Sequence, residues 1–200
     1  MKKLKSLFKK PTETFELILE SDINWIKTLL FFSCNGIVFI YYKMRSEGII
    51  DIESLSSTIG SVFAMIFLGT IYGILSNFII GFLIKLTGKI FNAKNDFRKI
   101  LNVLSWSYLP LLIAVLIIIP SIFVAKIITS DINVTIKLIL SIIVILLSFV
   151  QAILGIWQLI LLYKGLKVAQ TVSPINTILN YLLAGGIFGI FYYFVINPYL

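Results

Sequence analysis

Long apolar runs separated by short polar segments make up most of the chain, and five of the runs have the length of a membrane span. About 20 consecutive apolar residues cross a bilayer as a helix. The runs predict transmembrane helices over residues 25–42, 59–86, 105–128, 136–163 and 178–196. Their connections are short, which favours antiparallel neighbours. The expected fold class is an all-α integral membrane protein with five transmembrane helices in one compact bundle.

Between the second and third runs the pattern becomes amphipathic. Asn95 and Asp96 are typical helix-start residues, because their side chains accept hydrogen bonds from unpaired N–H groups. Apolar residues then recur at helical spacing, at Phe97, Ile100, Leu101 and Leu104. Pro110 can kink a helix that enters the hydrocarbon. We expect a short interfacial helix that turns at Pro110 and enters the membrane; the alternative is an ordinary loop before the third span.

This stretch also supplies the candidate interfacial and partner surface. Arg98 and Lys99 are expected to face water or lipid phosphate, whereas the apolar positions are expected to face the membrane. Trp106 belongs to the class of side chains that favour the headgroup level. The candidate surface consists of Phe97, Arg98, Lys99, Ile100, Trp106 and Pro110.

The N-terminal segment is basic and short. Phe15, Ile18 and Leu19 form an apolar stripe, which predicts a second short amphipathic helix on the membrane or on the bundle. The lysines before it would attract anionic headgroups. They are equally consistent with a plain orientation signal. The expected division is a cytoplasmic N-terminal segment, residues 1–22, and a five-span membrane domain, residues 23–200.

The basic residues are distributed unevenly between the two sides of the expected membrane domain. Three regions hold thirteen of the seventeen: the segment before the first span, the connection between spans two and three, and the connection between spans four and five. The other side holds Lys43, Arg45, Lys126 and Lys137. Because cytoplasmic loops carry the excess of Lys and Arg, this asymmetry predicts a cytoplasmic N-terminus and an outside C-terminus.

The ionisable residues argue against catalysis. No Asp or Glu falls inside an expected span, and the chain has no histidine. Cys34 therefore lacks the imidazole partner that would activate it as a nucleophile. We expect no enzyme activity, no cofactor and no metal site. Nucleic-acid binding is also disfavoured, because the basic residues lie at span ends and form no patch interleaved with aromatic residues.

Small and amide residues in the spans indicate where helices pack. Small residues allow close backbone approach in lipid, where no hydrophobic force drives helices together. The candidate helix-packing residues are Gly69, Gly73, Asn77, Gly81, Gly185 and Gly189. The candidate buried polar residues are Asn35, Gln151 and Gln158. Packing within the bundle is the simpler interpretation; a homo- or hetero-oligomer face, or a polar lining for a substrate, is the alternative.

The order of these features resembles the Yip-one domain family, in its prokaryotic branch. The resemblance is carried by the N-terminal basic helix with Pro11 and Phe15, by Trp25 before the first span, and by two stretches. These are KIFNAKNDFRKILNVLSWSYLPLLIAVLIIIP (residues 89–120) and GIWQLILLYKGLKVAQTVSPINTILNYLL (residues 155–183). The resemblance implies a five-span fold with a cytoplasmic N-terminus. Eukaryotic relatives act in vesicle traffic with Rab-type GTPases, a role that does not transfer to a prokaryotic member.

Two function classes follow. The first is a non-catalytic adaptor or envelope-homeostasis protein in the cell membrane of a prokaryote, with anionic lipid headgroups and other membrane proteins as its partners. The second is a transporter or channel for small molecules, ions or lipids, which would use Asn35, Asn77, Gln151 and the kink at Pro110. A continuous water-accessible groove lined by these amides would favour the second class.

Overall fold

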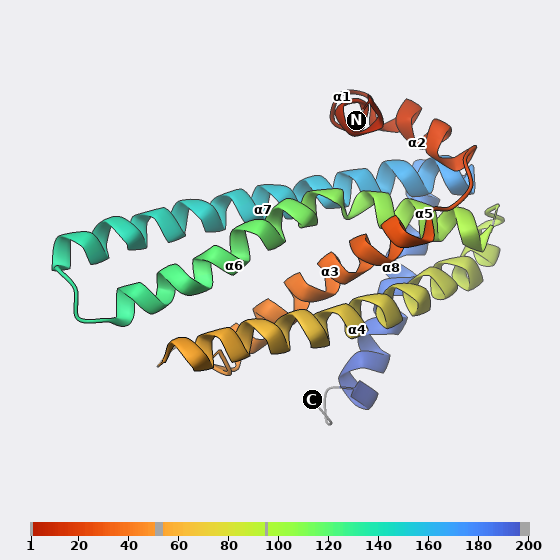
Figure 1. Cartoon of the computed structure of the whole chain (residues 1–200). Coiled ribbons are helices and arrows are strands. Elements are labelled where there is room, and N and C mark those ends of the chain that lie inside the picture. Colours follow the sequence, from red (N-terminus) through yellow and green to blue (C-terminus); the bar gives the residue numbers. More distant parts are fainter. Residues whose placement is uncertain (1, 51–53, 95, 197–200) are drawn as a thin grey trace. The chain divides into compact units, whose positions relative to one another are not determined.

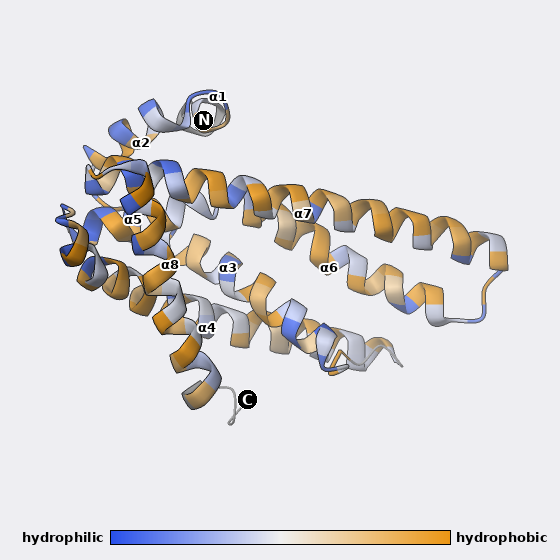
Figure 2. Cartoon of the chain, turned by 180° about the vertical axis from the view of Figure 1, so that it is seen from behind, coloured by the Kyte–Doolittle hydropathy of each residue, from blue (hydrophilic) through white to orange (hydrophobic). Residues whose placement is uncertain are grey.

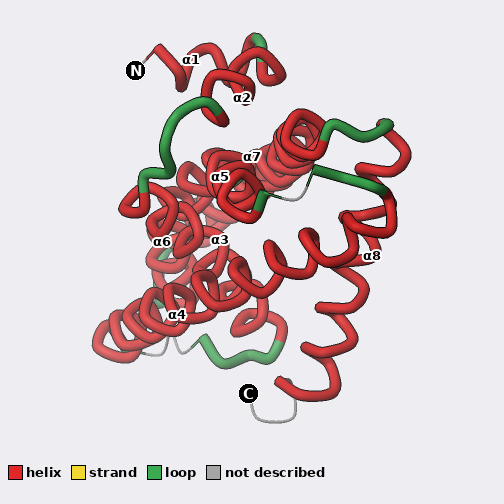
Figure 3. The backbone as a smooth tube through the Cα atoms, turned by 90° about the vertical axis from the view of Figure 1, so that its right-hand side faces the viewer, coloured by secondary structure: helices red, strands yellow, loops and turns green. Residues whose placement is uncertain are grey.

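The computed structural model describes residues 2–50, 54–94 and 96–196, and in these its regular structure is helical, without a strand (Figure 3). The elements are α1 (Lys2–Lys9), α2 (Pro11–Leu19), α3 (Trp25–Ser46), α4 (Leu55–Gly88), the 3-10 helix η1 (Lys89–Phe91), α5 (Phe97–Ser107), α6 (Leu109–Thr129), α7 (Val134–Gln170), α8 (Pro174–Phe191) and the π-helix η2 (Tyr192–Ile196). Within the described ranges, five helical stretches are long and apolar enough to span a membrane, which confirms the predicted count: Trp25–Ser46, Leu55–Phe91, Leu109–Thr129, Val134–Gln170 and Pro174–Phe194.

Two of these helices are longer than the apolar runs that predicted them. Helix α4 has 34 residues and α7 has 37. At a rise of about 1.5 Å per residue, α7 is roughly 55 Å long, more than the roughly 30 Å of hydrocarbon in a bilayer. Helix formation therefore continues past the apolar run, because good helix formers such as Lys164 and Lys167 extend it.

The start of the third span differs from the expectation. The chain leaves the helix at Tyr108 (φ −84°, ψ 2°), so that residues 105–107 belong to α5 and the span begins at Leu109. Pro110 lies in the first turn of α6, where its missing N–H has no helical partner to lose. It begins a helix and does not kink one. The proline inside the helix is Pro120.

The chain divides into two compact units. Unit 1 consists of Met1–Leu29, Leu75–Ser107 and Leu159–Leu200, and unit 2 of Leu30–Ile74 and Tyr108–Gln158. Helices α3, α4 and α7 therefore contribute residues to both units. The placement of all five spans in one bundle stays a prediction, as do the domain bounds 1–22 and 23–200.

Unit 2 consists of long helices joined by short connections. Helices α3 and α4 run side by side, and α6 lies along α7 (Figure 1). The rings of Phe39 and Tyr72 stack between α3 and α4, with their centroids 4.5 Å apart. The hydroxyl of Tyr42 donates a 2.9 Å hydrogen bond to Oε1 of Gln151, which links α3 to α7.

Unit 1 is built around α5. Ile100, Leu101 and Leu104 of this helix are fully buried, as are Phe15 of α2 and Leu161 of α7. Helix α8 is tied to α4 through Asn180, whose amide nitrogen donates to the carbonyl of Ile84 at 3.2 Å. The hydroxyl of Thr87 donates to the carbonyl oxygen of the same Asn180 side chain.

Helices α6 and α7 are apolar along most of their length (Figure 2). Only 6% of the residues in the apolar stretch of α7 are buried by other parts of the protein. Its exposed side chains include Ile142, Leu146, Phe149 and Ile153. Because water would not tolerate so large an apolar surface, these side chains face lipid.

Candidate functional site

Helices α3 and α4 make their closest approach at three glycines of unit 2. A Cβ atom added to Gly36 would lie 1.9 Å from the carbonyl oxygen of Gly69 and 2.4 Å from the nitrogen of Gly73. A Cβ atom on Gly73 would lie 2.1 Å from the carbonyl oxygen of Phe32. No side chain can occupy these positions without moving the backbone. Gly69 and Gly73 therefore lie at a helix contact, and Gly36 is the partner that sequence analysis missed.

The four-residue repeat of α4, Gly69, Gly73, Asn77 and Gly81, does not contact a single neighbouring helix along its whole length. Residues four apart on a helix are rotated by about 40°, so that Gly81 points roughly 120° away from Gly69. A Cβ atom on Gly81 would lie 2.8 Å from Cδ2 of Leu101, on α5. Asn77, which lies between Gly73 and Gly81 in this repeat, is fully buried.

Gly185 and Gly189 of α8 behave differently. A Cβ atom at either position would meet nothing within 4 Å in the part of the chain that the structure describes. The expectation that this pair packs within the protein therefore stays a prediction. A contact with a second membrane protein at them stays a prediction.

Helix α5 is fixed in unit 1 on its apolar side. A Cβ atom on Gly165 of α7 would lie 2.6 Å from Cγ1 of Val103 and 2.9 Å from Cε1 of Phe15, so α7 approaches both α5 and α2 closely. The side-chain nitrogen of Asn102 donates a 3.2 Å hydrogen bond to the carbonyl of Ile18, the last turn of α2. The apolar side of α5 is therefore covered by protein, and the expectation that it faces lipid is wrong.

This placement divides the candidate partner surface. Ile100 and Pro110 are buried and cannot form part of a surface. Phe97 and Trp106 are half-buried, and Arg98 and Lys99 are exposed. The ring of Phe97 lies beside that of Phe78 of α4, with centroids 6.5 Å apart. Nζ of Lys85 lies over the Phe97 ring, 6.0 Å from its centroid. The role of Phe97 is packing within unit 1, which leaves the two cations as the exposed members of the surface.

The three candidate buried amides occupy two kinds of environment. Gln151 is buried and bonded to Tyr42, whereas Asn35 and Gln158 are half-buried. Sequence analysis missed Asn180 and Asn102, which are buried and make the hydrogen bonds described above. Both lie in segments of mixed polarity, where a buried amide and a solvated one look alike in the sequence.

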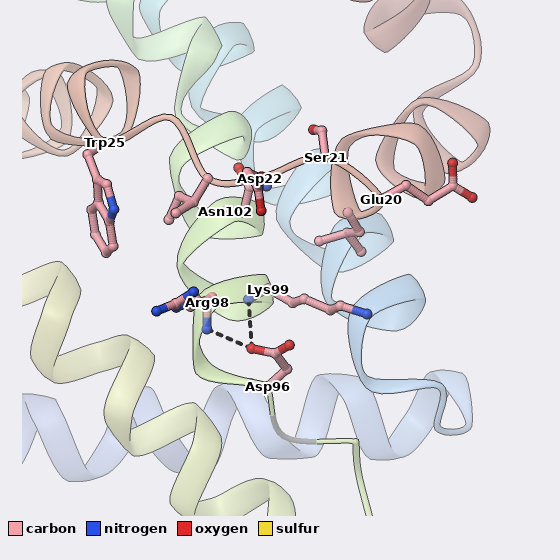
Figure 4. Close-up of a pocket in the computed structure, with 10 residues that line it drawn as sticks. Glu20, Ser21, Asp22, Trp25, Asp96, Arg98, Lys99 and Asn102 are labelled. Carbon is pink, nitrogen blue, oxygen red and sulfur yellow. Dashed lines mark hydrogen bonds between the residues drawn. The ribbon is translucent and has the colours of Figure 1, made fainter.

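A polar cavity of about 390 Å³ lies between the α2–α3 connection and the first turns of α5 (Figure 4). Its lining residues include three acidic ones, Glu20, Asp22 and Asp96, and two basic ones, Arg98 and Lys99. Asn102 lines it as well. The volume falls within the range of small-molecule sites, roughly 300–1,000 Å³. Sequence analysis named the cations, but it could not bring Glu20 and Asp22 to them across more than 70 residues.

Asp96 has a structural part in this cavity. Its Oδ1 accepts hydrogen bonds from the backbone nitrogens of Arg98, at 2.9 Å, and Lys99, at 3.4 Å. It is therefore the N-cap of α5, as the sequence predicted; Asn95, the other predicted helix-start residue, lies outside the described residues. Arg98 and Lys99 point in opposite directions from the first turn, Arg98 towards the side of Trp25 (Figure 4).

Trp25 connects the cavity to a candidate membrane span. It lines the cavity and is the first residue of α3, a candidate membrane span. Its ring stacks on Phe78 of α4 with centroids 6.3 Å apart. Tryptophan is a residue that favours the level of lipid headgroups.

Comparison with known proteins identifies a family. Residues 5–196 match the profile of the Yip1 domain. Neither a curated protein nor a solved structure matches the chain.

Proposed function

The chain belongs to the Yip1 domain family, and on that basis we propose that it is a non-catalytic protein of the family's prokaryotic branch, an adaptor or envelope-homeostasis protein that acts by binding. The family consists generally of non-catalytic membrane proteins. This chain is a multi-pass membrane protein with five candidate spans. The proposal places it in the cell membrane.

The observation that carries the proposal is the fixed position of α5. Its apolar side is enclosed by α2, α4 and α7, while Arg98 and Lys99 remain exposed at the edge of a polar cavity. A helix held in this way presents its charged side chains at little further cost in backbone conformational entropy. This is an arrangement for recognition. The described residues include no group of three or more Cys, Asp or Glu side chains placed to hold a metal ion.

Charge supports the proposed orientation. Unit 1 contains thirteen of the seventeen Lys and Arg residues and unit 2 contains four. The N-terminal segment, the α4–α5 connection and the α7–α8 connection, which the positive-inside rule assigns to the cytoplasm, all belong to unit 1. We therefore propose that the N-terminus and α5 face the cytoplasm and that the C-terminus lies outside.

Transport is the second function class, but the structure places its candidate residues in contacts within the protein. Gln151 is engaged by Tyr42, and Asn77 is fully buried. Neither these amides nor Asn35 lines the polar cavity at α5.

A flux measurement separates the two classes. The full chain is reconstituted into liposomes loaded with a pH dye, with an ion-sensitive dye, or with fluorescent lipid in one leaflet. An adaptor gives rates equal to those of protein-free liposomes in all three assays. A rate above that background, lowered by Gln151→Leu, would overturn the adaptor proposal and establish transport.

Orientation is tested by cysteine labelling in a Cys34→Ala background. Single cysteines replace the exposed Lys94 of unit 1 and the exposed Asp131 of unit 2. In intact cells, an impermeant maleimide is expected to label position 131 but not position 94. Position 94 is expected to be labelled only after the cells are permeabilised. The reverse pattern would contradict the proposed orientation.

A further inference from the structure

A second cavity, of about 230 Å³, lies in unit 2 where the end of α3 meets α6 and α7. Its described lining residues are Tyr41, Arg45, Gly48, Ile50, Ser121, Ile122, Ala125 and Val144. Most of them are apolar, and the one formal charge among them is that of Arg45. All of them belong to unit 2, so none takes part in the recognition surface formed by Arg98 and Lys99 of α5. The cavity is therefore a largely apolar chamber that carries a single cation.

Gly48 gives this end of α3 its shape. Its φ of 69° lies in the left-handed region, which glycine adopts without strain. The nitrogen of Gly48 donates to the carbonyl of Arg45 at 3.3 Å. The nitrogen of Ile49 donates to the carbonyl of Met44 at 2.9 Å. This is the Schellman pattern, in which the chain reverses and the last carbonyls of the helix are satisfied. The reversal brings Ile50 to the cavity, and it leaves fewer unpaired carbonyls to repel an anion at this helix end.

Arg45 and Tyr41 form a polar pair, one helical turn apart, in the lining of this cavity. Nη1 of Arg45 donates a long hydrogen bond, of 3.4 Å, to the hydroxyl of Tyr41. Tyr41 is only 6% exposed, and the hydrogen bonds of the described residues give its own hydroxyl proton no acceptor. Arg45 makes no ion pair in the described part of the chain, and the neighbouring acid Glu47 is paired with Lys43. Both side chains therefore keep donors available for an anion.

Helix α3 brings this pair to the edge of the hydrocarbon. Its 22 residues span about 33 Å, close to the roughly 30 Å of hydrocarbon in a bilayer. Arg45 lies in the last turn of this candidate span, and Tyr41 lies one turn before it. The pair is therefore within reach of phospholipid phosphates. Ile122 and Ala125 of α6 and Val144 of α7 also belong to candidate spans, so the apolar part of the cavity is built from membrane segments.

From these observations we infer that this cavity binds an anionic phospholipid. The phosphate lies at Arg45 and Tyr41, and the first part of an acyl chain lies against Ile122 and Ala125. A phosphate oxygen accepts from the guanidinium and from the phenol O–H, and charge-assisted hydrogen bonds are the stronger kind. A headgroup with an ammonium gains less, because the described lining residues include no carboxylate. The volume is below that of whole small-molecule sites, roughly 300–1,000 Å³, which suits one segment of a lipid better than a complete soluble ligand.

The test uses the full chain in nanodiscs that contain phosphatidylglycerol, phosphatidylethanolamine and phosphatidylcholine in equal amounts, each with a photoreactive group near the head of its acyl chain. After illumination, mass spectrometry of peptides compares cross-linking at residues 41–50 and 121–125 with that at residues 145–153, a largely exposed stretch of α7. Phosphatidylglycerol is expected to be enriched several-fold at the cavity relative to that stretch. The same proportions of the three lipids at both places would mean that lipid merely surrounds the protein, and would overturn the inference.

Three variants test the polar end of the site. Arg45→Gln should abolish the enrichment, because one lost charge-assisted hydrogen bond corresponds to about tenfold in affinity. Tyr41→Phe removes one neutral donor and should reduce the enrichment about twofold, whereas Arg45→Lys keeps the charge and should keep most of it. Lys137→Gln is the matched control, since it removes one positive charge from α7 outside the lining. Enrichment that survives in Arg45→Gln, or that is lost equally in Lys137→Gln, would contradict a site at Arg45.

The apolar end and the source of the phosphate have their own readouts. Ala125→Phe fills the chamber and should lower the enrichment several-fold, whereas Ala152→Phe, at an exposed position of α7 outside the lining, should leave it unchanged. An equal response of these two variants would show that no acyl chain enters the cavity. Soluble glycerophosphoglycerol is added as a competitor, and displacement as effective as that by the lipid would overturn a lipid as the ligand. Circular dichroism checks the helix content of each variant.

Discussion

Units 1 and 2 hold their helices together in opposite ways. In unit 2, α3 and α4 meet backbone to backbone at Gly36, Gly69 and Gly73. In unit 1, α5 is surrounded through large side chains such as Leu101 and Val103, which fill the space left by Gly81 and Gly165. Enlarging a side chain should therefore be most harmful in unit 2, and truncating one should be most harmful in unit 1.

The units also differ in charge. The basic and acidic residues of unit 2 are equal in number, four of each, so the chain's formal net charge of +8 lies in unit 1. The polar cavity also lies in unit 1. Unit 1 thus combines a buried core around α5 with the excess positive charge of the chain. The predictions below test this contrast.

The largest effect is expected from truncation in unit 1. Leu101→Ala should lower the free energy of unfolding by about 2–5 kcal/mol, because Leu101 is fully buried and its loss leaves a cavity beside Gly81. Thermal unfolding in detergent measures the change. Leu116→Ala on α6 is the matched control; its side chain is 66% exposed, so the loss should be small. Equal losses would mean that α5 is not enclosed by protein.

Enlargement in unit 2 comes next. Gly36→Ala should destabilise the protein by about 1–3 kcal/mol or more, because the new methyl group meets backbone atoms of Gly69 and Gly73, which cannot rotate away. Gly155→Ala on α7 is the control, since its Cβ would meet nothing within 4 Å among the described residues; it should be neutral or slightly stabilising. Gly48 is a poorer control, because its φ of 69° strains any side chain. Unchanged stability in Gly36→Ala would refute the close α3–α4 contact.

A smaller difference in stability loss is expected between two buried amides that link helices, Asn180 in unit 1 and Gln151 in unit 2. Asn180→Leu removes two interactions, with Ile84 and Thr87, at a fully buried site in unit 1. Gln151→Leu removes one, with Tyr42, in unit 2. The expected losses are about 1–2 kcal/mol for Asn180→Leu and about 0.6 kcal/mol for Gln151→Leu, the scale of interhelical hydrogen bonds in membranes. Chemical unfolding in bicelles compares them, and a reversed order would contradict the contrast.

The smallest effect on stability is expected at the cavity. Arg98→Gln with Lys99→Gln should change the free energy of unfolding by no more than about 0.5 kcal/mol, because both side chains are exposed and unpaired within the described ranges. The same thermal unfolding assay measures it. A loss comparable with that of Leu101→Ala would show that the two cations are part of the packing of unit 1 and would remove them from the recognition surface.

The sequence by itself determined the class of protein and most of its elements. Continuous apolar runs predict membrane helices because lipid requires every backbone N–H and C=O group to be bonded within a helix. The helix start at Asp96 and the amphipathic pattern of α5 were also readable, since they depend on neighbours along the chain. The family resemblance rested on the same local features.

The tertiary structure decided which surfaces face which neighbours. The local sequence does not determine whether an apolar side chain of a membrane protein contacts protein or lipid. Ile100 was therefore expected at the membrane interface, whereas the structure buries it fully within the protein. Glycine spacing likewise did not show that Gly81 lies against α5, or that a Cβ atom at Gly185 would meet nothing within 4 Å in the described part of the chain. Glu20 and Asp22 join Arg98 and Lys99 only through folding. Burial and charge pairing depend on residues distant in sequence, whereas helix formation in lipid is a local requirement of the backbone.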